Sequence, residues 1–395
     1  MRESLAASPV KLDASVVGLG SVRPGFQFSS NGDRVVFKKR MWQGLGEVTE
    51  LYSVPASGGA SIKLNGSMAA GGGVSAWQLS SDGTRVIYWA DQETPGVSDV
   101  FVVPTIGGAP QKLSDSLVDA GSTGGGFVGP NGDRAVFIAS QIADPFSGPY
   151  FELFSAPATG GAAVELSGPM ANGGDVQSIV VRPDGGRVVY LADEVTDNVV
   201  ELFSVSPLGG QPVKLNATLV GDGDVFPDGL QFSPDGNFVL YSADQDTNGV
   251  AEIFRVATTG GTPFKLNVPL ESGRSVTPGS QRFSPDGTRV LYRADQIADD
   301  VFELFIVPSG GGTPVRLNGP LVVDGDVKSE GLQFSPDGSR VLYHADQETH
   351  DVYELFSVPS AGTALEVCCW GSFYGCRNNK IGHETPPANR TAGGA

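Results

Sequence analysis

Short runs of apolar residues separated by turn residues recur along most of the chain. In the last complete copy the sequence reads GLQFSPDGSRVLYHADQETHDVYELFSVPS, from Gly331 to Ser360. The run RVLYHA is apolar on successive residues, as in a strand that is covered on both faces. The run YELFSVP follows it and ends at a Pro-containing turn. Runs rich in Val, Phe, Tyr and Leu, with a turn about every 8–12 residues and no helical period, predict an all-β fold.

A pair of Asp or Asn with Gly follows the first strand signal of each copy. Gly tolerates positive φ and Asp can bond to the backbone of its own turn, so the pair reverses the chain. Each copy spans about 51 residues and holds four strand signals. Seven such copies predict a seven-bladed β-propeller of four-stranded antiparallel blades. The pairs begin at Asn31, Asp82, Asn131, Asp184, Asp235, Asp286 and Asp337.

The repeat resembles the TolB-type propeller repeat. The resemblance rests on FSPDG followed by an apolar strand, then ELFSVP, and then a short strand such as PVRLN at Pro314 to Asn318. It covers roughly residues 10 to 363. It implies a propeller located outside the cytoplasm, in the periplasm or at the cell surface. TolB itself has six blades and an N-terminal α/β domain, and this sequence contains neither.

The two ends of the repeat predict how the propeller closes. The sequence SPVKLD at residues 8–13 matches the fourth-strand pattern but precedes the first complete copy, whereas ALEV after Gly362 is a poorer fourth strand. An unpaired sheet edge invites aggregation, so we expect the N-terminal strand to complete the last blade and close the ring. This interpretation places the propeller at residues 1–367. Residues 368–395 share nothing with the repeat, and we expect them to be a disordered tail.

The charge of the chain limits its partners. There are 44 Asp and Glu against 26 Lys and Arg, for a net charge of -18. Such a surface repels nucleic acid phosphates, so we expect no nucleic acid partner. No apolar run approaches the length of a transmembrane helix, and MRESLAASPVKLDASVV at the start lacks the apolar core of a signal peptide. We expect a monomer that binds a protein or glycan partner through one face of the disc.

Catalytic motifs are scarce. No G-x-S-x-G sequence occurs, and we interpret the three histidines (His344, His350 and His383) as surface, turn and tail residues. Gly-rich stretches such as AAGGGV do not precede a helix, as a phosphate loop would. Cys368, Cys369 and Cys376 lie near the end without the paired spacing of a zinc site. The sequence therefore predicts no catalytic residue and no required cofactor.

Carboxylates are predicted to gather on one face of the disc. In a four-stranded blade, the turn between the second and third strands lies at the same end as the connection to the next blade. Both segments are rich in Asp here. Asp175, Asp224 and Asp326 lie in the connections, just before the innermost strands. We expect these three to lie near the mouth of the channel, as candidate ligand-binding residues.

One of the turns resembles a calcium loop. It reads DQDTNGVAE and provides Asp244, Asp246, Asn248 and Glu252 as candidate ligands for calcium. The loop is shorter than an EF-hand loop, and the other copies keep only the first Asp and the later Glu. The alternative is that each Asp caps its hairpin and each Glu faces solvent at the start of the next strand.

Three functions remain open on the sequence. The first is a non-catalytic binding scaffold; the near-identity of the copies favours it, together with the third function below, because a catalytic centre usually breaks the symmetry at one blade. The second is an enzyme, either a hydrolase or lyase or the propeller portion of a larger peptidase. The third is a purely structural surface repeat. The expectation from the sequence is the scaffold.

Overall fold

The structure is a computed structural model of the chain. It describes residues 9–13, 20–43, 46–114, 126–129, 133–141, 150–171 and 173–362. The chain divides into two units, residues 1–362 and 363–395, and every described residue belongs to the first. The predicted tail at residues 368–395, with its cysteines and His383, therefore lies outside the described residues.

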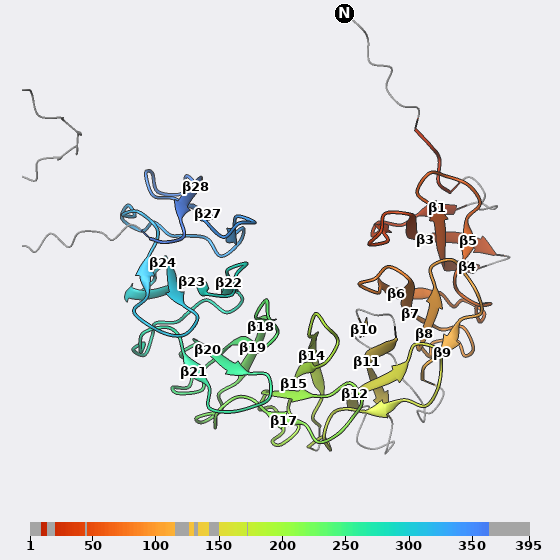
Figure 1. Ribbon diagram of the computed structural model, residues 1–395, viewed down its shortest axis with the longest axis horizontal. Helices are drawn as coiled ribbons and strands as arrows, with labels where there is room; N and C mark the ends of the chain where they lie inside the picture. The colour runs from red at the N-terminus through yellow and green to blue at the C-terminus, as the bar shows by residue number, and fades with distance from the viewer. Residues whose placement is uncertain are drawn as a thin grey trace, which may run out of the picture. The chain divides into compact units, whose positions relative to one another are not determined.

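Seven antiparallel sheets follow one another along the chain (Figure 1). The first three are β1 (Gly20–Val22), β2 (Gln27–Phe28), β3 (Arg34–Gln43), β4 (Gly46–Pro55), β5 (Ile62–Lys63); β6 (Val74–Leu79), β7 (Arg85–Ala90), β8 (Asp99–Pro104), β9 (Gln111–Lys112); and β10 (Gly126–Val128), β11 (Arg134–Gln141), β12 (Tyr150–Pro157), β13 (Val164–Glu165). The fourth and fifth are β14 (Val176–Val181), β15 (Val188–Ala192), β16 (Glu201–Val205), β17 (Val213–Lys214); and β18 (Val225–Phe232), β19 (Phe238–Ala243), β20 (Glu252–Ala257), β21 (Phe264–Lys265). The sixth and seventh are β22 (Arg282–Phe283), β23 (Arg289–Ala298), β24 (Val301–Pro308), β25 (Val315–Arg316); and β26 (Gln333–Phe334), β27 (Arg340–Ala345), β28 (Glu354–Pro359).

The Asp-Gly turns form as the sequence predicts. In the sixth sheet, Ser284 Oγ donates to Asp286 Oδ1 at 2.5 Å, the Thr288 N–H donates to the same oxygen at 3.1 Å, and Gly287 has a φ of 71°. These hydrogen bonds lower the pKa of Asp286 to about 2, because they favour the ionised carboxylate. The side chain of each such Asp is therefore engaged by its own turn.

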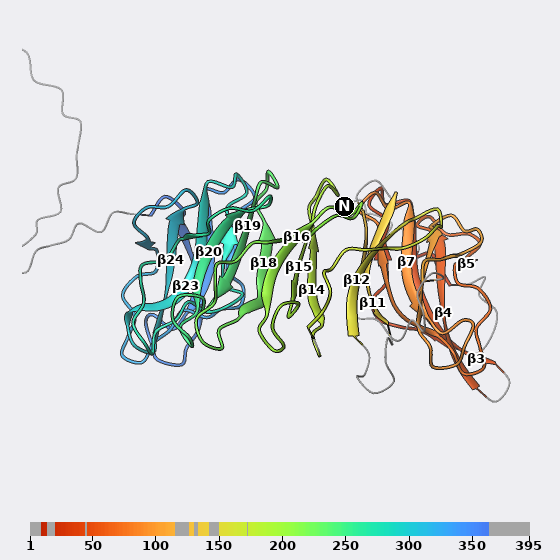
Figure 2. The ribbon, with the colours of Figure 1, turned by 90° about the horizontal axis from the view of Figure 1, so that it is seen from below.

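The hydrophobic core lies between consecutive sheets. One cluster joins Leu291 and Leu304 of the sixth sheet to Val341 and Tyr343 of the seventh, and comparable clusters join each earlier pair of neighbours. The first strands of neighbouring sheets contact each other, as β6 contacts β10 and β14 contacts β18. The first strands therefore form the inner edge of the series and the fourth strands its outer edge, with the sheets standing side by side (Figures 1 and 2).

This architecture confirms the prediction of an all-β, seven-bladed propeller of antiparallel sheets. In the first sheet, β1 and β2 both pair with the same edge of β3 and together take the place of one strand. The part of the chain that the structure describes contains no helix, and therefore none that is long and apolar enough to cross a membrane.

The predicted closure by the N-terminal strand is not formed in this structure. Among the described residues the seventh sheet has three strands, and β28 pairs with β27 alone. No strand pairing or hydrophobic cluster of these residues joins the seventh sheet to the first. The segment expected to bridge them, residues 9–13, lies against the first sheet only.

The contacts of residues 9–13 explain this difference. Leu12 packs against the cluster of Val35, Phe37, Tyr52 and Val54, and its carbonyl accepts from Ser61 Oγ at 3.1 Å. Val10 lies against Gly58 of the first sheet. In the same way Ile62, in the fourth strand of the first sheet, lies against Gly107 of the second sheet. The segment thus makes the contacts of a fourth strand with the next sheet, while its pairing with a third strand is missing.

Candidate metal and ligand sites

An aspartate directly follows the second strand in four of the sheets, and in the sixth sheet the equivalent aspartate lies within that strand. In the fifth sheet, Asp244 Oδ1 accepts from the Asp224 N–H at 2.5 Å, and its Oδ2 accepts from the Gly249 N–H at 2.8 Å. The residue five positions after the Asp has a positive φ in each hairpin, and Gly, Asn or Asp occupies it. Each carboxylate therefore caps its hairpin. The five aspartates are Asp91, Asp193, Asp244, Asp295 and Asp346.

The predicted channel-mouth residues Asp175, Asp224 and Asp326 lie at three separate junctions between sheets. Asp175 and Asp326 each accept a backbone N–H from the third strand of the preceding sheet, at 2.7 and 2.9 Å. Asp224 accepts a backbone N–H from the residue just before the third strand of its preceding sheet, at 2.8 Å. Their own N–H groups donate to the hairpin aspartates of the next sheet. Burial, followed by the charge of Asp193, raises the pKa of Asp175. The structure does not bring the three carboxylates together, and each links two neighbouring sheets.

Two of the four predicted calcium ligands form ion pairs with a lysine. Lys265 Nζ lies 2.7 Å from Asp246 Oδ2 and 2.6 Å from Glu252 Oε2. Contacts with these two residues raise the pKa of Lys265 although burial lowers it. Two of the four candidate ligands are thus already paired with a cation. Calcium would have to displace the ammonium group, and calcium binding stays a prediction.

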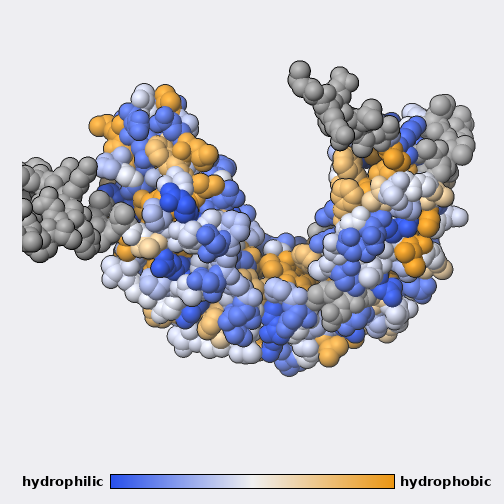
Figure 3. Space-filling view, turned by 45° about the horizontal axis from the view of Figure 1, so that its top comes forward, coloured by the Kyte–Doolittle hydropathy of each residue, from blue (hydrophilic) through white to orange (hydrophobic). Residues whose placement is uncertain are grey.

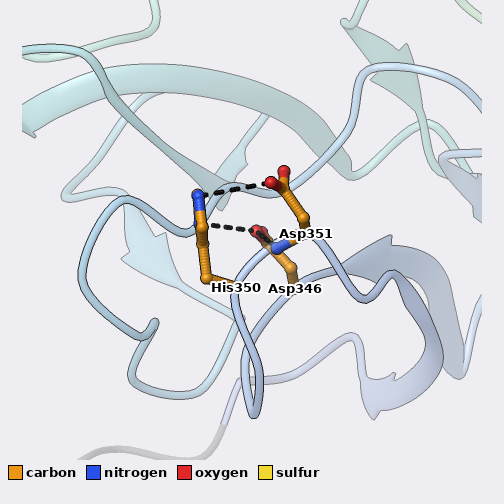
Figure 4. Close-up of side chains that lie close together, drawn as sticks. All are labelled: Asp346, His350 and Asp351. Carbon is orange, nitrogen blue, oxygen red and sulfur yellow. Dashed lines mark hydrogen bonds and ion pairs between the residues drawn. The ribbon is translucent and has the colours of Figure 1, made fainter.

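The hairpin of the seventh sheet carries a histidine between two carboxylates (Figure 4). His350 Nδ1 lies 3.6 Å from Asp346 Oδ2, and its Nε2 lies 3.5 Å from Asp351 Oδ2. Asp346 is fully buried, and burial would raise its pKa. Hydrogen bonds from the Asp326 and Asp351 N–H groups outweigh this effect and lower the pKa. Sequence reasoning treated His350 as an ordinary turn residue. Comparing the fourth and fifth positions after each hairpin Asp would have singled it out.

A cavity of about 330 Å³ lies along the inner edge, beside the Asp-Gly turns. Its apolar lining comes from Phe232, Phe283 and Phe334, the Phe of FSPDG in three consecutive copies. Its polar lining includes Gln231 and Arg282, and an Arg282 nitrogen donates to the Gly279 and Gln281 carbonyls at 2.6 and 2.7 Å. The sequence analysis did not select this cavity, although the FSPDG repeat contains the aromatic residues that form it.

The comparisons with known proteins identify the fold. No protein-family profile matches the sequence, and no characterised protein resembles it in sequence. Among solved structures, dipeptidyl peptidase 4 from Porphyromonas gingivalis is similar over 81% of this chain, with a TM-score of 0.57 and 12% identity. This chain spans 48% of that protein, about half its length.

Two other enzymes show weaker similarity. A prolyl endopeptidase matches over 86% of this chain and 50% of its own length, with a TM-score of 0.49 and 13% identity. An oligogalacturonate lyase in complex with manganese matches over 84% of this chain and 87% of its own, with a TM-score of 0.43 and 14% identity.

These similarities correct the functional expectation. The propeller fold is shown by the likeness to the dipeptidyl peptidase. The prediction of a non-catalytic binding scaffold is corrected, because the solved structure that is similar to this chain at a TM-score above 0.5 is that of an enzyme, dipeptidyl peptidase 4. The symmetry of the repeats is no sign against catalysis, because a symmetric propeller can be one part of an asymmetric enzyme.

Proposed function

We propose that this chain is the propeller portion of an enzyme that acts on peptides. The observation that carries the proposal is the likeness to dipeptidyl peptidase 4, which covers 81% of this chain and 48% of that one. The propeller would hold and orient the peptide. The TolB-type character of the repeat, with the location outside the cytoplasm that it implies, belongs to the same proposal and rests on the recurring FSPDG sequence.

The inner cavity has suitable chemistry for a peptide. Phe232 and Phe334 are partly exposed and offer apolar rings against which a proline or aliphatic side chain can pack, whereas Phe283 is largely buried beneath the cavity. Arg282 has five N–H donors, and the nitrogen that bonds to the two carbonyls accounts for only some of them. The remaining donors suit a peptide carboxylate. The cavity therefore combines an apolar floor with one cationic group.

Peptide binding tests the proposal. Fluorescently labelled short peptides with a free or amidated C-terminus would be titrated into the full chain, and mass spectrometry would detect cleavage. We expect peptides with a free carboxylate to bind, and Phe232→Ala to weaken binding about tenfold or more, as for loss of a buried aromatic contact. Phe264→Ala is the matched control, because Phe264 lies on the outer strand β21 and is 47% exposed.

Two outcomes would refute the peptide proposal. One is binding of oligogalacturonate with no binding of any peptide. The other is equal peptide binding by the Phe232 and Phe264 variants, which would exclude the inner cavity as the contact surface.

A further inference from the structure

We propose that Asp346, His350 and Asp351 form a binding site for a divalent transition metal ion such as Zn²⁺. The three side chains belong to one hairpin between β27 and β28. One ligand atom from each can be chosen so that all three lie within 4.8 Å of one another. Figure 4 shows the imidazole ring beside both carboxylates. Two carboxylates and one imidazole are ligands that zinc accepts, with a fourth position left for water.

The carboxylate of Asp346 is held in place and keeps the capacity to bind metal. Its Oδ1 accepts from the Asp326 N–H at 2.6 Å and its Oδ2 accepts from the Asp351 N–H at 3.0 Å. A carboxylate oxygen has two acceptor positions, so one remains on each oxygen. The same hydrogen bonds fix its orientation, as outer partners commonly do for a metal ligand. Half-exposed His350 and exposed Asp351 leave a path for the ion to enter.

The other hairpins form an internal comparison for this site. In the sixth sheet the equivalent residues are Asp295, Asp299 and Asp300, which also gather within 4.8 Å. Asp300 and Asp351 have nearly the same φ, 56° and 61°, although β23 continues to Ala298 whereas β27 ends at Ala345. The sixth-sheet set offers only oxygen and suits hard cations, whereas the imidazole of the seventh-sheet set favours zinc and its neighbours. The described hairpins with a capping Asp carry His at this position only in the seventh sheet.

A simple ion pair is the competing explanation. A protonated His350 would be attracted by both carboxylates, and the 3.5 and 3.6 Å separations suit such a pair. The two explanations differ in what Zn²⁺ does. A metal ion replaces the ring proton and draws the ligands together, whereas a stable ion pair leaves Zn²⁺ unbound.

Zinc titration of the full chain tests the site. The three cysteines would be changed to serine so that thiols cannot compete, and binding would be followed by calorimetry and by the visible spectrum of Co²⁺. We expect one Zn²⁺ per chain and a Co²⁺ spectrum typical of oxygen and nitrogen ligands. His350→Ala should weaken Zn²⁺ binding about tenfold or more. His350→Asp copies the sixth-sheet ligand set and should also lose Zn²⁺ selectivity over Mg²⁺.

A gain of function in the sixth sheet provides the control. Asp299→His would place an imidazole beside Asp295 and Asp300, so the number of bound Zn²⁺ ions should rise from one to two. Unchanged Zn²⁺ affinity in the His350→Ala chain would overturn the proposal. So would the absence of saturable binding in the parent chain, which would leave the ion pair as the explanation.

Discussion

The sixth and seventh sheets have nearly the same sequence, yet their third strands differ in burial. Leu304 of β24 is fully buried, and its N–H donates to Asn318 Oδ1 at 2.8 Å. The equivalent Leu355 of β28 is 75% exposed. The difference is the neighbouring sheet: Leu304 packs against Val341 and Tyr343 of the seventh sheet, and no described sheet packs against the corresponding face of the seventh sheet, where Leu355 lies. Burial of these side chains is thus decided by the sheet that packs against them and not by the strand's own pattern.

The first sheet shows the complementary difference. Leu12 packs on the cluster of Val35, Phe37, Tyr52 and Val54, which belongs to the first sheet alone. The same sheet exposes Phe26 and Phe28, whose exposed fractions are 67% and 62%. Figure 3 shows apolar surface on both the first and the seventh sheet. In the sixth sheet Val315 of the fourth strand pairs with Ile306 of the third. By alignment of the repeats, Val10 near the N-terminus corresponds to Val315, and Ser357 of β28 corresponds to Ile306. We therefore expect residues 9–13 to pair with β28 in solution, and the predictions below test this pairing.

A disulfide across the expected pairing should have the largest effect. Val10→Cys with Ser357→Cys, in a chain with the native cysteines changed to serine, should oxidise within one molecule. Closing so long a loop should raise the free energy of unfolding by about 5 kcal/mol. Non-reducing electrophoresis and chemical denaturation measure both effects. A disulfide between two chains, or none, would mean that the ends do not meet in a monomer.

Removing the Leu12 side chain should have the next largest effect. It packs on Val35 and Phe37, and in a closed ring it would also cover Leu355. Leu12→Ala should therefore cost about 2–4 kcal/mol in denaturant unfolding, as for a buried leucine. Leu208→Ala is the control, because Leu208 is 72% exposed and its loss should cost no more than about 0.5 kcal/mol. Equal, small losses in the two variants would contradict closure.

A double-mutant cycle on Lys11 and Glu354 sharpens the comparison. In the sixth sheet Arg316 lies 2.6 Å from Glu303, and Lys11 and Glu354 occupy the same two positions. Here Lys11 is 75% exposed and lies 3.9 Å from Asp13. Closure should produce a coupling energy of about 0.5–1 kcal/mol between Lys11 and Glu354. The Arg316–Glu303 cycle is the positive control, and zero coupling for the terminal pair alone would indicate an open ring.

Calcium binding to the fifth-sheet hairpin should have the smallest effect on stability. Weak sites of this kind bind at about 10⁻⁴–10⁻³ M, so millimolar calcium should add about 0.4–1.4 kcal/mol of stability, less what the displaced Lys265 contributes. Thermal melts in calcium chloride and in sodium chloride of matched ionic strength measure the gain. Asp246→Ala should remove part of it. Equal stabilisation by both salts would mean general screening of the acidic face.

Much of the fold could be predicted because its signals are local. The Asp-Gly turns, such as Asp286-Gly287, need particular residues to reverse the chain, and strand runs between them follow from apolar patterning. The candidate sites were predicted less well. Asp224 looked like a ligand from its position, but its carboxylate accepts the Val200 N–H of the preceding sheet. His350 looked ordinary because its two carboxylate neighbours become significant only when the hairpin folds.

The sequence by itself determined the number of sheets and their turns, since both depend on residues within one copy of about 51. Only the tertiary structure decided which third strand is covered, which aspartates link sheets, and where residues 9–13 lie. These features depend on contacts between copies, and between the two ends of the repeat. A pattern within one copy carries no information about its neighbour, so the burial of Leu304 and the exposure of Leu355 arise from nearly the same local sequence.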